Sequence, residues 1–474
     1  MSRAVVIGAG LGGVLAAAAL SPLVDEVVVL DRDDLPDGPE HRKGVPQGRH
    51  AHLLLPGGLA AMEYLVPKIS IRDHLLAAGA HEISLSSDVV TLSPEGWFRR
   101  WRQSDHHMIT CSRALLDWAV RSAVTDNTGN VEIRTAQVTG LIGSARRVRG
   151  VRVDTPTGPT ELEADIIVDA SGRGSRILTW LTGLGITGID EKNVDSGLVN
   201  ATRIYRTPPG AERFPLTMVQ ANPYVSRPGR SAVIVPIEGN RWMVSLAGSR
   251  GGEPPADPDG FLRYTLDLPH PIVGRLISGA EPLTEIFVSR STSNSRRYLE
   301  KARDWPDGLV VLGDALATFN PAYGQGMSVA ALGAQALRHQ LENADLASPG
   351  LARKVQRAAA KFVETAWSVA VGQDGMYPEV RGGKRTAADR VAGRYTRRLM
   401  KAATGSYAAA TALWDVTGLK AGPARLLRPG TVLAALTGSP LPPLSEPPLT
   451  PRERELLDLL DATSGEGAPS STPA

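Results

Sequence analysis

Three features of this 474-residue chain predict an α/β protein built in several parts. Near the N-terminus, an apolar β-branched run leads through a glycine-rich turn into an Ala-rich helix, between residues 4 and 20. Short strand patterns separated by Pro and Gly dominate residues 196–289, and helical periodicity dominates residues 349–460. We therefore predict a Rossmann-like α/β domain, an inserted antiparallel sheet and a C-terminal helical region.

The composition is that of a soluble globular protein, with 42% hydrophobic and 21% charged residues. A net charge of +3 is too small to indicate a nucleic-acid partner. The single cysteine, Cys111, excludes an internal disulfide and is typical of a reducing cytoplasm, where we expect the protein to work. No apolar run reaches the ~18 residues of a membrane span, and glycines interrupt the one stretch that resembles a secretory signal, so we expect neither.

Gly8, Gly10 and Gly13 have the Gly-x-Gly-x-x-Gly spacing, directly after a strand pattern and before a helix pattern. In such turns the glycines allow a tight bend, a close approach to a pyrophosphate and close packing of the helix on the strand. The phosphates then meet the free amides at the helix N-terminus. Asp31 ends the next strand, 18 residues after Gly13, where it can accept hydrogen bonds from a ribose. Together these residues predict a dinucleotide site.

Helix and strand patterns alternate along the rest of the chain. Helices are expected at residues 57–65, 71–80 and 112–124, and strands at 108–111, 131–136, 148–154 and 164–169. A hairpin is expected at 82–101, turning at Ser93–Gly96 and carrying Trp97, Phe98 and Trp101. The inserted sheet is predicted from the patterns at 196–205, 231–236, 241–247 and 283–289.

A second glycine-rich block follows the inserted sheet. A buried strand at 308–312 ends in Gly313-Asp314, and a helix runs from about Gly326 to Leu341. A side chain would prevent the backbone from lying against a flat ring, so Gly324 and Gly326 fit such a contact. The helix that begins near Gly326 would also direct its positive end at negative charge on such a ring. We therefore expect the two blocks to hold one extended cofactor.

Two further groups of residues have ordinary structural explanations. His41, His50 and His52 are close in sequence, but no spacing typical of a metal site accompanies them, so we predict no metal. The run from Arg381 to Lys401 places basic residues at helical spacing. Such a run is usually a solvated helix face and less often a patch for an anion or a partner, and both explanations stay open.

Three separated blocks carry a resemblance to a known family: Gly8 to Asp31, Arg113 at the start of a helix, and Gly313-Asp314 followed by Pro321 and Gly324-x-Gly326. Together they resemble the FAD-binding set of single-component flavin monooxygenases of the aromatic hydroxylase and squalene epoxidase type. Within that superfamily, HRKGVPQGRHAHLL, VDASGRGSR and WPDGLVVLGDALATFNPAYGQGMS look like segments of the polyene epoxidases of monensin-type and lasalocid-type polyether antibiotic pathways. The resemblance covers roughly residues 3 to 340.

The resemblance implies a set of FAD-binding residues. The glycines of the first block would cradle the pyrophosphate beside Arg42, and Asp31 would hold the adenosine ribose. Arg113 would lie on the flavin side, Val138 on the adenine side, and Asp314 would bond the ribityl chain. The complete implied set is Gly8, Gly10, Gly13, Asp31, Arg32, Arg42, Arg113, Val138, Asp314, Pro321, Gly324, Gly326 and Met327.

The implied FAD-binding domain is discontinuous. It comprises residues 1–80, 103–195 and 290–342, and the substrate domain comprises 81–102 and 196–289. A C-terminal helical region at 343–461 is expected to form part of the substrate pocket wall, because its helices have apolar faces to bury. The Pro-rich stretch at 438–451 is predicted to be a linker, and residues 462–474 a disordered tail.

The resemblance leaves the reductant open. The hydroxylases have an Asp-Gly pair with a downstream Arg that is linked to both FAD and NADPH binding. Here Asp169 and Arg176 match, but Ala170 replaces the Gly. NAD(P)H is therefore expected to reduce the FAD either directly or through a separate flavin reductase.

The resemblance implies a monooxygenase that uses O2 to epoxidise an alkene through a C4a-hydroperoxyflavin. The inserted strands are rich in Val, Leu, Ile and Trp, which fits an apolar polyene, polyketide or terpenoid substrate, and we predict no catalytic side chain. Aromatic hydroxylation is the alternative. Halogenation is disfavoured, because the segment WFRRWRQ lacks the Trp-x-Trp-x-Ile-Pro motif and the pocket lysine of halogenases. A flavin-bound binding protein without oxygen chemistry is the third hypothesis.

Overall fold

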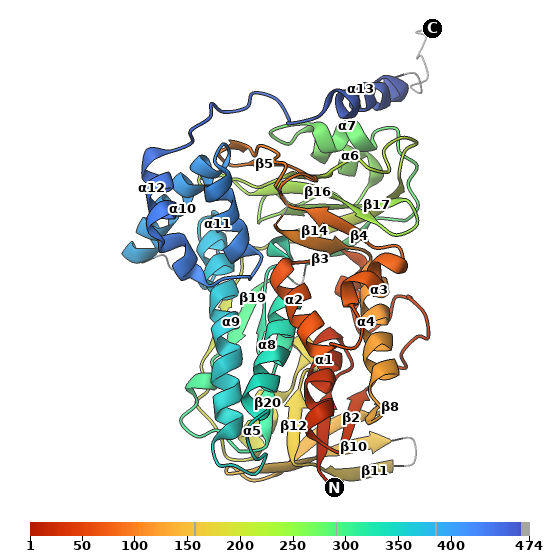
Figure 1. The fold of residues 1–474 in the computed structure, drawn as a ribbon, viewed down its shortest axis with the longest axis vertical. Helices are drawn as coiled ribbons and strands as arrows, with labels where there is room; N and C mark the ends of the chain where they lie inside the picture. The colour runs from red at the N-terminus through yellow and green to blue at the C-terminus, as the bar shows by residue number, and fades with distance from the viewer. Residues whose placement is uncertain (104, 156–157, 291, 384–385, 466–474) are drawn as a thin grey trace.

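A parallel sheet forms the centre of the lower half of the molecule in Figure 1. The computed structural model describes residues 1–103, 105–155, 158–290, 292–383 and 386–465. The sheet has the strand order β20-β12-β1-β2-β8, and all four of its pairings are parallel. Its strands are β20 (Leu309–Val311), β12 (Ile166–Asp169), β1 (Arg3–Ile7), β2 (Glu26–Asp31) and β8 (Val131–Thr135). The most buried of these strands are continuous apolar runs, as expected of strands covered on both faces.

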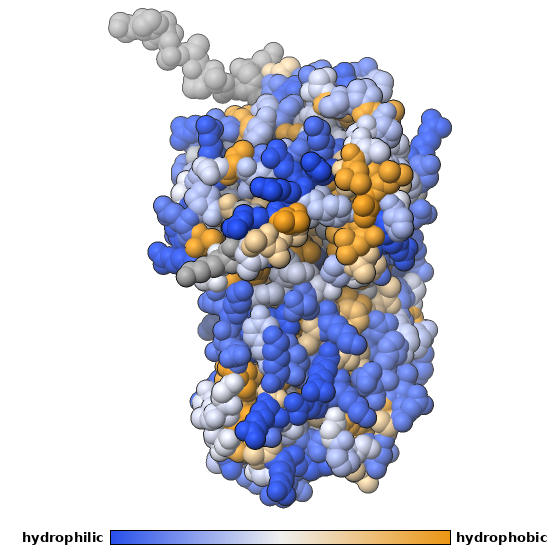
Figure 2. All heavy atoms as spheres, turned by 90° about the vertical axis from the view of Figure 1, so that its left-hand side faces the viewer, coloured by the Kyte–Doolittle hydropathy of each residue, from blue (hydrophilic) through white to orange (hydrophobic). Residues whose placement is uncertain are grey.

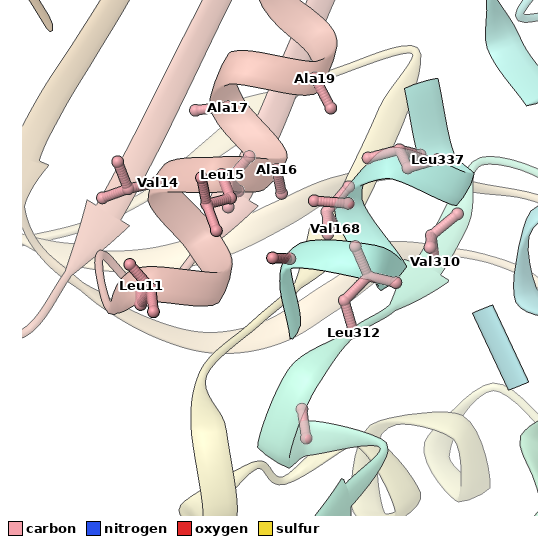
Figure 3. Packing of buried hydrophobic residues seen from close by; sticks show 14 of the residues in the cluster. Leu11, Val14, Leu15, Ala16, Ala17, Ala19, Val168, Val310, Leu312 and Leu337 are labelled. Atoms are coloured by element: carbon pink, nitrogen blue, oxygen red, sulfur yellow. The ribbon is translucent and has the colours of Figure 1, made fainter. Parts of the chain in front are cut away.

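Helices cover this sheet and pack closely because their contact residues are small. The helix α1 (Leu11–Leu20) is buried on almost every side, and Figure 3 shows Leu15, Ala16 and Ala19 on the helix that faces Leu337 of α8 (Gly326–Leu341). A methyl group on Gly12 would lie only 3.5 Å from Cβ of Ala330 on α8. Beside them lie α2 (Pro56–Leu65), α4 (Arg113–Asn127), on the right in Figure 1, and α9 (Leu351–Asp374), on the left.

A seven-stranded sheet forms the upper half of the molecule (Figure 1). Its pairings are antiparallel except for the parallel pair of β15 and β5. The strand order is β18 (Phe287–Ser289), β14 (Val199–Arg206), β17 (Arg241–Gly248), β16 (Arg230–Ile237), β15 (Leu216–Val219), β5 (Val89–Ser93) and β6 (Gly96–Trp97). One face packs on α6 (Pro258–Leu266) and α7 (Ile272–Ile277) through an aromatic core that includes Trp242 and Phe261.

Three smaller sheets complete the fold, and the first of them lies at the bottom of Figure 1. One is β11 (Gly158–Glu163), β10 (Val148–Thr155) and β9 (Gln137–Gly143). The second is β3 (Leu53–Leu54), β7 (His107–Thr110) and β4 (His81–Ser84). The third is β13 (Glu191–Val194), β19 (Asn294–Arg297) and β21 (Ala317–Thr318). The helix α3 (Ile71–Ala77) and the helix α5 (Ile177–Gly183) lie on the surface of the lower half.

The C-terminal helices lie beside both halves. They are α10 (Ala387–Ala403), α11 (Tyr407–Thr417), α12 (Pro429–Thr437) and α13 (Pro451–Gly465). The first three pack on one another around Leu399, Leu413 and Ala435, and α13 packs on α7. Among the described residues, no helix has the length and apolar character that a membrane span requires.

The predicted fold class is confirmed: a parallel α/β core, an antiparallel sheet and C-terminal helices are all present. Several details differ from the predictions. The pattern missed β9, β11 and β15, and the 82–101 segment divides, with β4 pairing to β7 while β5 and β6 form the hairpin. The helix α13 begins at Pro451, where Thr450 and Glu453 cap its first turn reciprocally, and it continues to Gly465, past residue 462, where the tail was expected to begin. Residues 466–474 lie outside the described residues.

Candidate functional site: a glycine turn, a second loop and the ends of three distant helices

The first glycine turn has no room for side chains. Gly8 has φ +96°, and a Cβ there would lie 2.7 Å from the carbonyl oxygen of Ala170. A Cβ on Gly13 would lie 1.7 Å from the carbonyl oxygen of Gly8, closer than any two such atoms can approach. The amide of Gly8 also donates to the carbonyl of Leu30 on β2, at 2.7 Å. Backbone packing alone therefore fixes the turn that places the N-terminus of α1 at the edge of the sheet.

A guanidinium group lies over this helix N-terminus. The helix begins after Gly10, which has no side chain to cap it, so amides of the first turn point outward. The nearest atom to a Cβ built on Gly10 is Nη2 of Arg42, at 3.4 Å. The Arg42 side chain is only 10% exposed, and its Nε is buried without a partner among the described residues. The helix end and the guanidinium together form a strongly positive place that suits an anion.

Asp31 ties the turn to Arg42. Its Oδ2 accepts a hydrogen bond from the amide of Ala9 at 2.6 Å and lies 3.4 Å from Nη1 of Arg42. The carbonyl of Asp31 accepts from the amide of Ala136 at 2.7 Å, which brings Val138 on β9 to the same side. Arg32 points outward, 72% exposed, and borders a surface hollow of ≈ 520 Å³. The hollow is lined by Arg32, Asp33, Asp34, Leu35, Pro36, His41, Arg42 and Lys43.

Arg113 continues the positive lining. It is the first residue of α4, its side chain is 11% exposed, and its Nε contacts Oδ1 of Asp117 at 2.7 Å. A Cβ on Gly48 would lie 3.5 Å from Cγ of Arg113, so the chain passes close over it. Arg42 and Arg113 both border a narrow hollow beside the one described above. The structure therefore brings the predicted residues of the first two blocks to one continuous strip.

Asp314 stands where this strip meets the second glycine loop. It lies in the turn Gly313–Ala315 directly after β20, and a Cβ on Gly326 would be 3.9 Å from its Oδ1. Burial raises the pKa of the Asp314 carboxyl, and the positive charges of Arg113 and Arg173 draw it back down. Among the described residues no group donates a hydrogen bond to this carboxylate. It is an acceptor held close to two cations and without a bound donor.

The second loop leaves backbone accessible at its two glycines. The turn Pro321–Tyr323 ends at Gly324, which has φ +64°, and the nearest atom to a Cβ on Gly324 is Cβ of Leu53, at 3.9 Å. The helix α8 then begins at Gly326, with Met327 buried just inside it. The Oε1 of Gln325, between the glycines, is buried without a hydrogen bond among the described residues. Leu53 and Gly324 lie close to each other, so a flat ring at the predicted place would be bordered by them and would not fit between them.

A buried carboxylate that the sequence analysis missed supports this loop. Asp374, the last residue of α9, is 1% exposed. Its oxygens accept from Asn294 Nδ2 at 2.7 Å, from Asn320 Nδ2 at 2.9 and 3.0 Å, and from the Tyr323 hydroxyl at 2.7 Å. Burial raises the pKa of Asp374, and hydrogen bonds from Asn320, Tyr323, Asn294 and Ser196 lower it in part. No motif links these positions, because even Asn294, Asn320 and Tyr323 are 51 to 80 residues from Asp374 in the chain.

The C-terminal helices also reach the loop. Gln325 Nε2 donates to the carbonyl of Thr417, the last residue of α11, at 3.2 Å. The amide of Gly57 donates to the carbonyl of Gly418 at 2.9 Å, and a Cβ on Gly57 would lie 2.3 Å from the carbonyl oxygen of Leu419. Leu419 itself has φ +57°, an uncommon conformation for leucine that marks a tightly fitted junction. The end of α11 therefore closes one side of the second loop.

Two neutral histidines lie next to Leu53. Burial lowers the pKa of His50 to about 4, and its Nδ1 contacts the Thr202 hydroxyl at 2.9 Å. Burial and the nearby charge of Arg113 lower the pKa of His52 to about 3. The His52 Nδ1 contacts the backbone oxygen of His50 at 2.8 Å. Among the described residues, no group of three or more His, Cys, Asp or Glu side chains is placed to hold a metal ion.

The sheet face above the second loop is apolar. Leu53 and Ala51 pack against a cluster that strands β5, β15, β16 and β17 share with β7 and β4. The buried members are Leu55, Ile83, Val89, Met108, Leu216, Val235, Ile237 and Met243. Ser245 and Thr202 are the polar exceptions near His50, and their hydroxyls contact each other at 2.5 Å. The predicted ring site thus lies between a glycine loop and an apolar wall.

Asp169 has an internal role in this structure. It is fully buried at the end of β12, and its oxygens accept from the hydroxyls of Ser171 and Ser175, both at 2.6 Å. The next residue, Ala170, donates its amide to Ile7 on β1. This block therefore fastens the turn after β12 to the first glycine turn.

The same arrangement of layers occurs in solved structures of flavin enzymes. The flavin-dependent brominase Bmp2 has a TM-score of 0.62 at 15% identity, with 92% of this chain and 98% of that one covered. The myxobacterial chondrochloren halogenase CndH has a TM-score of 0.60 at 17% identity, covering 98% and 97%. PqsL of Pseudomonas aeruginosa, a probable FAD-dependent monooxygenase, has a TM-score of 0.58 at 18% identity, covering 79% and 97%. The fold is therefore that of FAD-dependent halogenases and monooxygenases.

Sequence comparison defines the nearer relationship. Protein Rv3254 of Mycobacterium tuberculosis (strain ATCC 25618 / H37Rv) is 32% identical over 378 residues, which are 77% of this chain and 78% of that protein. The chain belongs to the family of this mycobacterial protein. No protein-family model matches the chain.

Proposed function

We propose that this protein is an FAD-dependent monooxygenase. The observation that carries the proposal is the continuous strip from the N-terminus of α1 to the N-terminus of α8, along which Arg42, Arg113 and Asp314 follow one another. An extended dinucleotide with a phosphate centre and a flat ring at one end matches that order of positive, acidic and side-chain-free positions. The fold shared with FAD-dependent monooxygenases supports the same conclusion.

The residues present fit the cofactor. The buried Nε of Arg42 and Oε1 of Gln325 lack partners, and bound FAD would offer phosphate and ring polar groups along the same strip. Arg42 and the amides at the start of α1 would hold the pyrophosphate, and Asp31, Arg32 and Val138 would lie on the adenosine side. Arg113 and Asp314 would hold the ribityl side, while Pro321, Gly324, Gly326 and Met327 would line the ring. The Asp31 carboxylate would exchange its bond to Ala9 for one to the ribose, or share it.

We propose epoxidation of an alkene as the reaction. Bound FAD supplies the redox chemistry, in which two electrons, two protons and O2 convert an alkene into an epoxide and one water. The apolar face around Leu53, Met243 and Ile237 would orient an apolar polyene, polyketide or terpenoid and exclude water from the ring. An alkene is nucleophilic without losing a proton, so no acid or base is required of the wall. The resemblance to polyether-pathway epoxidases supports this subtype.

Aromatic hydroxylation is the second candidate. PnpA of Pseudomonas putida DLL-E4, a p-nitrophenol 4-monooxygenase, has the same fold with a TM-score of 0.57 at 17% identity. A phenol would need a base near the ring, and His50 and His52 lie just before Leu53 in the chain. Their lowered pKa values make both imidazoles weak bases, because a group with a conjugate-acid pKa near 3 or 4 takes up protons poorly at neutral pH. This favours the alkene.

We further propose that the FAD-binding domain, the substrate domain and the C-terminal helical region are divided from one another as predicted from the sequence. The C-terminal region, which touches Gln325 through Thr417, would close the pocket rather than act as a separate enzyme. NAD(P)H would deliver electrons directly or through a flavin reductase. Direct delivery has no support from Asp169, because that carboxylate is used to fasten the turn after β12.

A labelling experiment tests the function. Purified protein with its bound flavin is incubated with ¹⁸O2, NADPH with and without an added flavin reductase, and two substrate panels. One panel contains apolar polyenes with trisubstituted double bonds, and the other contains phenols of similar size. We expect one label per oxirane from the first panel and no phenol oxidation. Labelled catechols from the second panel would show that the reaction is aromatic hydroxylation and not epoxidation. Protein that contains no flavin after reconstitution would contradict the whole proposal.

A further inference from the structure

Apolar side chains stand out from the surface of the C-terminal helices. Leu427, Leu433 and Leu436 are 68%, 60% and 67% exposed, and Val391 on α10 is 64% exposed. Leu433 and Leu436 are about one turn apart and therefore lie on one face of α12. Figure 2 shows apolar residues gathered on the upper part of the face that carries α10 and α12. Clustered exposed apolar side chains of this kind mark a contact surface.

The same unit, residues 386–441, is strongly basic. It holds eight Lys and Arg and two Asp, a net charge of +6 in a chain whose total is +3. Both acids are occupied inside the protein, because Asp389 caps α10 and Asp415 pairs with Arg425 at 2.8 Å. Five exposed cations of the unit form no ion pair with any described residue: Arg390, Arg394, Arg398, Lys401 and Arg428.

The cations and the apolar side chains are interleaved. Val391 precedes Arg394 and Arg398 by three and seven residues on α10, so the three share one face. Arg428 directly follows Leu427 at the start of α12. At an anionic bilayer, apolar side chains enter the acyl boundary while neighbouring Lys and Arg meet the phosphates. We propose that residues 386–441 dock this protein on the surface of an anionic lipid bilayer.

Two observations favour a bilayer over a protein partner. A second copy would bring the same positive surface against itself, because a two-fold contact pairs a patch with its own copy. The three leucines, each at least 60% exposed, belong to a segment rich in unpaired cations, whereas the cores of protein interfaces are depleted of charged residues. Protruding leucines surrounded by unpaired cations match the depth profile of a bilayer interface.

Docking would bring the site close to a source of apolar substrate. The helix α11 packs on both α10 and α12, and its last residue, Thr417, accepts a hydrogen bond from Gln325 in the second glycine loop. The docking surface and the proposed ring site are therefore linked through one helix. The docking stands on the surface residues themselves; only its purpose, the collection of a membrane-dissolved substrate, rests on the proposed function.

Vesicle co-sedimentation of the full-length protein with its flavin tests the docking. We expect binding to phosphatidylcholine vesicles that contain phosphatidylglycerol, weak binding to phosphatidylcholine alone, and loss of binding at high salt. The double variant Leu433→Asp/Leu436→Asp should bind at least about tenfold more weakly. Arg394→Gln/Arg398→Gln should bind the anionic vesicles about thirtyfold more weakly, since two cations near the surface contribute about 1 kcal/mol each.

The matched control is Leu459→Asp on α13, whose side chain is 59% exposed but lies outside the basic unit. It should bind like the unchanged protein. Equal binding to both kinds of vesicle, no binding to either, or an equal loss in the control would overturn the proposal. A concentration-dependent dimer that Leu433→Asp/Leu436→Asp abolishes would assign the patch to a second copy instead. Because vesicle binding is measured without turnover, its failure is distinct from failure of the epoxidase assay.

Discussion

Two helix N-termini face the proposed FAD site, and the protein supports them in different ways. The turn before α1 is fixed by backbone packing, with Gly13 pressed on Gly8 and Gly8 bonded to Leu30. The loop before α8 is fixed by side chains from far along the chain, chiefly Asp374 of α9. The first support is local and the second is tertiary. The difference predicts that the two loops fail separately, and that each can be damaged without the other.

The largest effect is expected from Gly13→Ala. The new methyl group would lie 1.7 Å from the Gly8 carbonyl oxygen, which only a backbone shift could relieve. We expect a loss of more than about 3 kcal/mol in the free energy of unfolding, together with loss of bound flavin. Gly12→Ala is the matched control, because its methyl group meets Ala330 at an ordinary 3.5 Å. Chemical denaturation of both variants measures the difference, and equal stability would show that the turn is not fixed by this packing.

Asp374→Ala should damage the second loop alone. It removes one buried acceptor and leaves the amides of Asn294 and Asn320 and the Tyr323 hydroxyl without a partner. We expect a cost of about 3 kcal/mol in stability and a loss of about tenfold or more in FAD affinity. Binding of ADP, which needs only the first turn, should stay unchanged. A shifted visible flavin spectrum at saturating FAD would locate the damage at the ring.

Lys361→Ala is the control for this experiment, since Lys361 is exposed on the same helix. Asp374→Asn keeps the shape of the side chain but can accept fewer hydrogen bonds, so its effect should be intermediate. If Asp374→Ala weakened ADP and FAD binding equally, the two loops would form one cooperative unit and the comparison would fail.

The same comparison explains what the sequence could predict. The first turn is visible as a motif because its causes lie within residues 7–31, where the glycines and Asp31 stand at fixed spacing. The second loop was also recognisable from Asp314, Gly324 and Gly326. Its support was not, because a buried Asp at the end of an amphipathic helix has no local signal that sets it apart from a solvated one.

The inserted sheet shows the same limit. Its long strands were predicted from alternation, but β15 is four residues among prolines and pairs in parallel with β5, more than 120 residues earlier. The position of α11 against Gln325 could not be predicted either, because it depends on Leu419 adopting a positive φ. Only the presence of C-terminal helices follows from periodicity; their docking on the loop is a tertiary event.

Asp314→Ala tests where the two loops meet. The variant removes a charge-assisted acceptor that FAD would bond, typically about 1.5 to 3 kcal/mol, so FAD affinity should fall by about tenfold to a hundredfold. Asp314→Asn should recover part of that loss by keeping one acceptor oxygen. Because burial disfavours the charged form of Asp314 and raises its pKa, removal of the charge should not destabilise the apoprotein strongly. Unchanged FAD affinity in Asp314→Ala would remove this residue from the proposed site.

The smallest expected effect concerns the segment that faces the second loop from the opposite side. Burial lowers the pKa of His50 from an ordinary 6.5 to about 4, so protonation favours the unfolded chain. The contribution of such a histidine to the free energy of unfolding is fully present above pH 6.5 and is lost as the pH falls toward 4. The loss is about 2 kcal/mol per histidine between pH 7 and pH 5. His50→Gln can keep a hydrogen bond to Thr202 but does not titrate, so it should remove about that amount from the pH dependence.

Urea denaturation at pH 7 and pH 5 measures this difference for the unchanged protein, for His50→Gln and for His339→Gln on the exposed end of α8. In the His50→Gln variant, His52, whose pKa is lowered to about 3, should still contribute about half of the original pH dependence. His339→Gln serves as the surface control, because His339 is exposed. His50→Gln could instead leave the pH dependence of the free energy of unfolding unchanged while His339→Gln reduces it. In that case water would reach the wall beside Leu53, and this would contradict the exclusion of water from the ring.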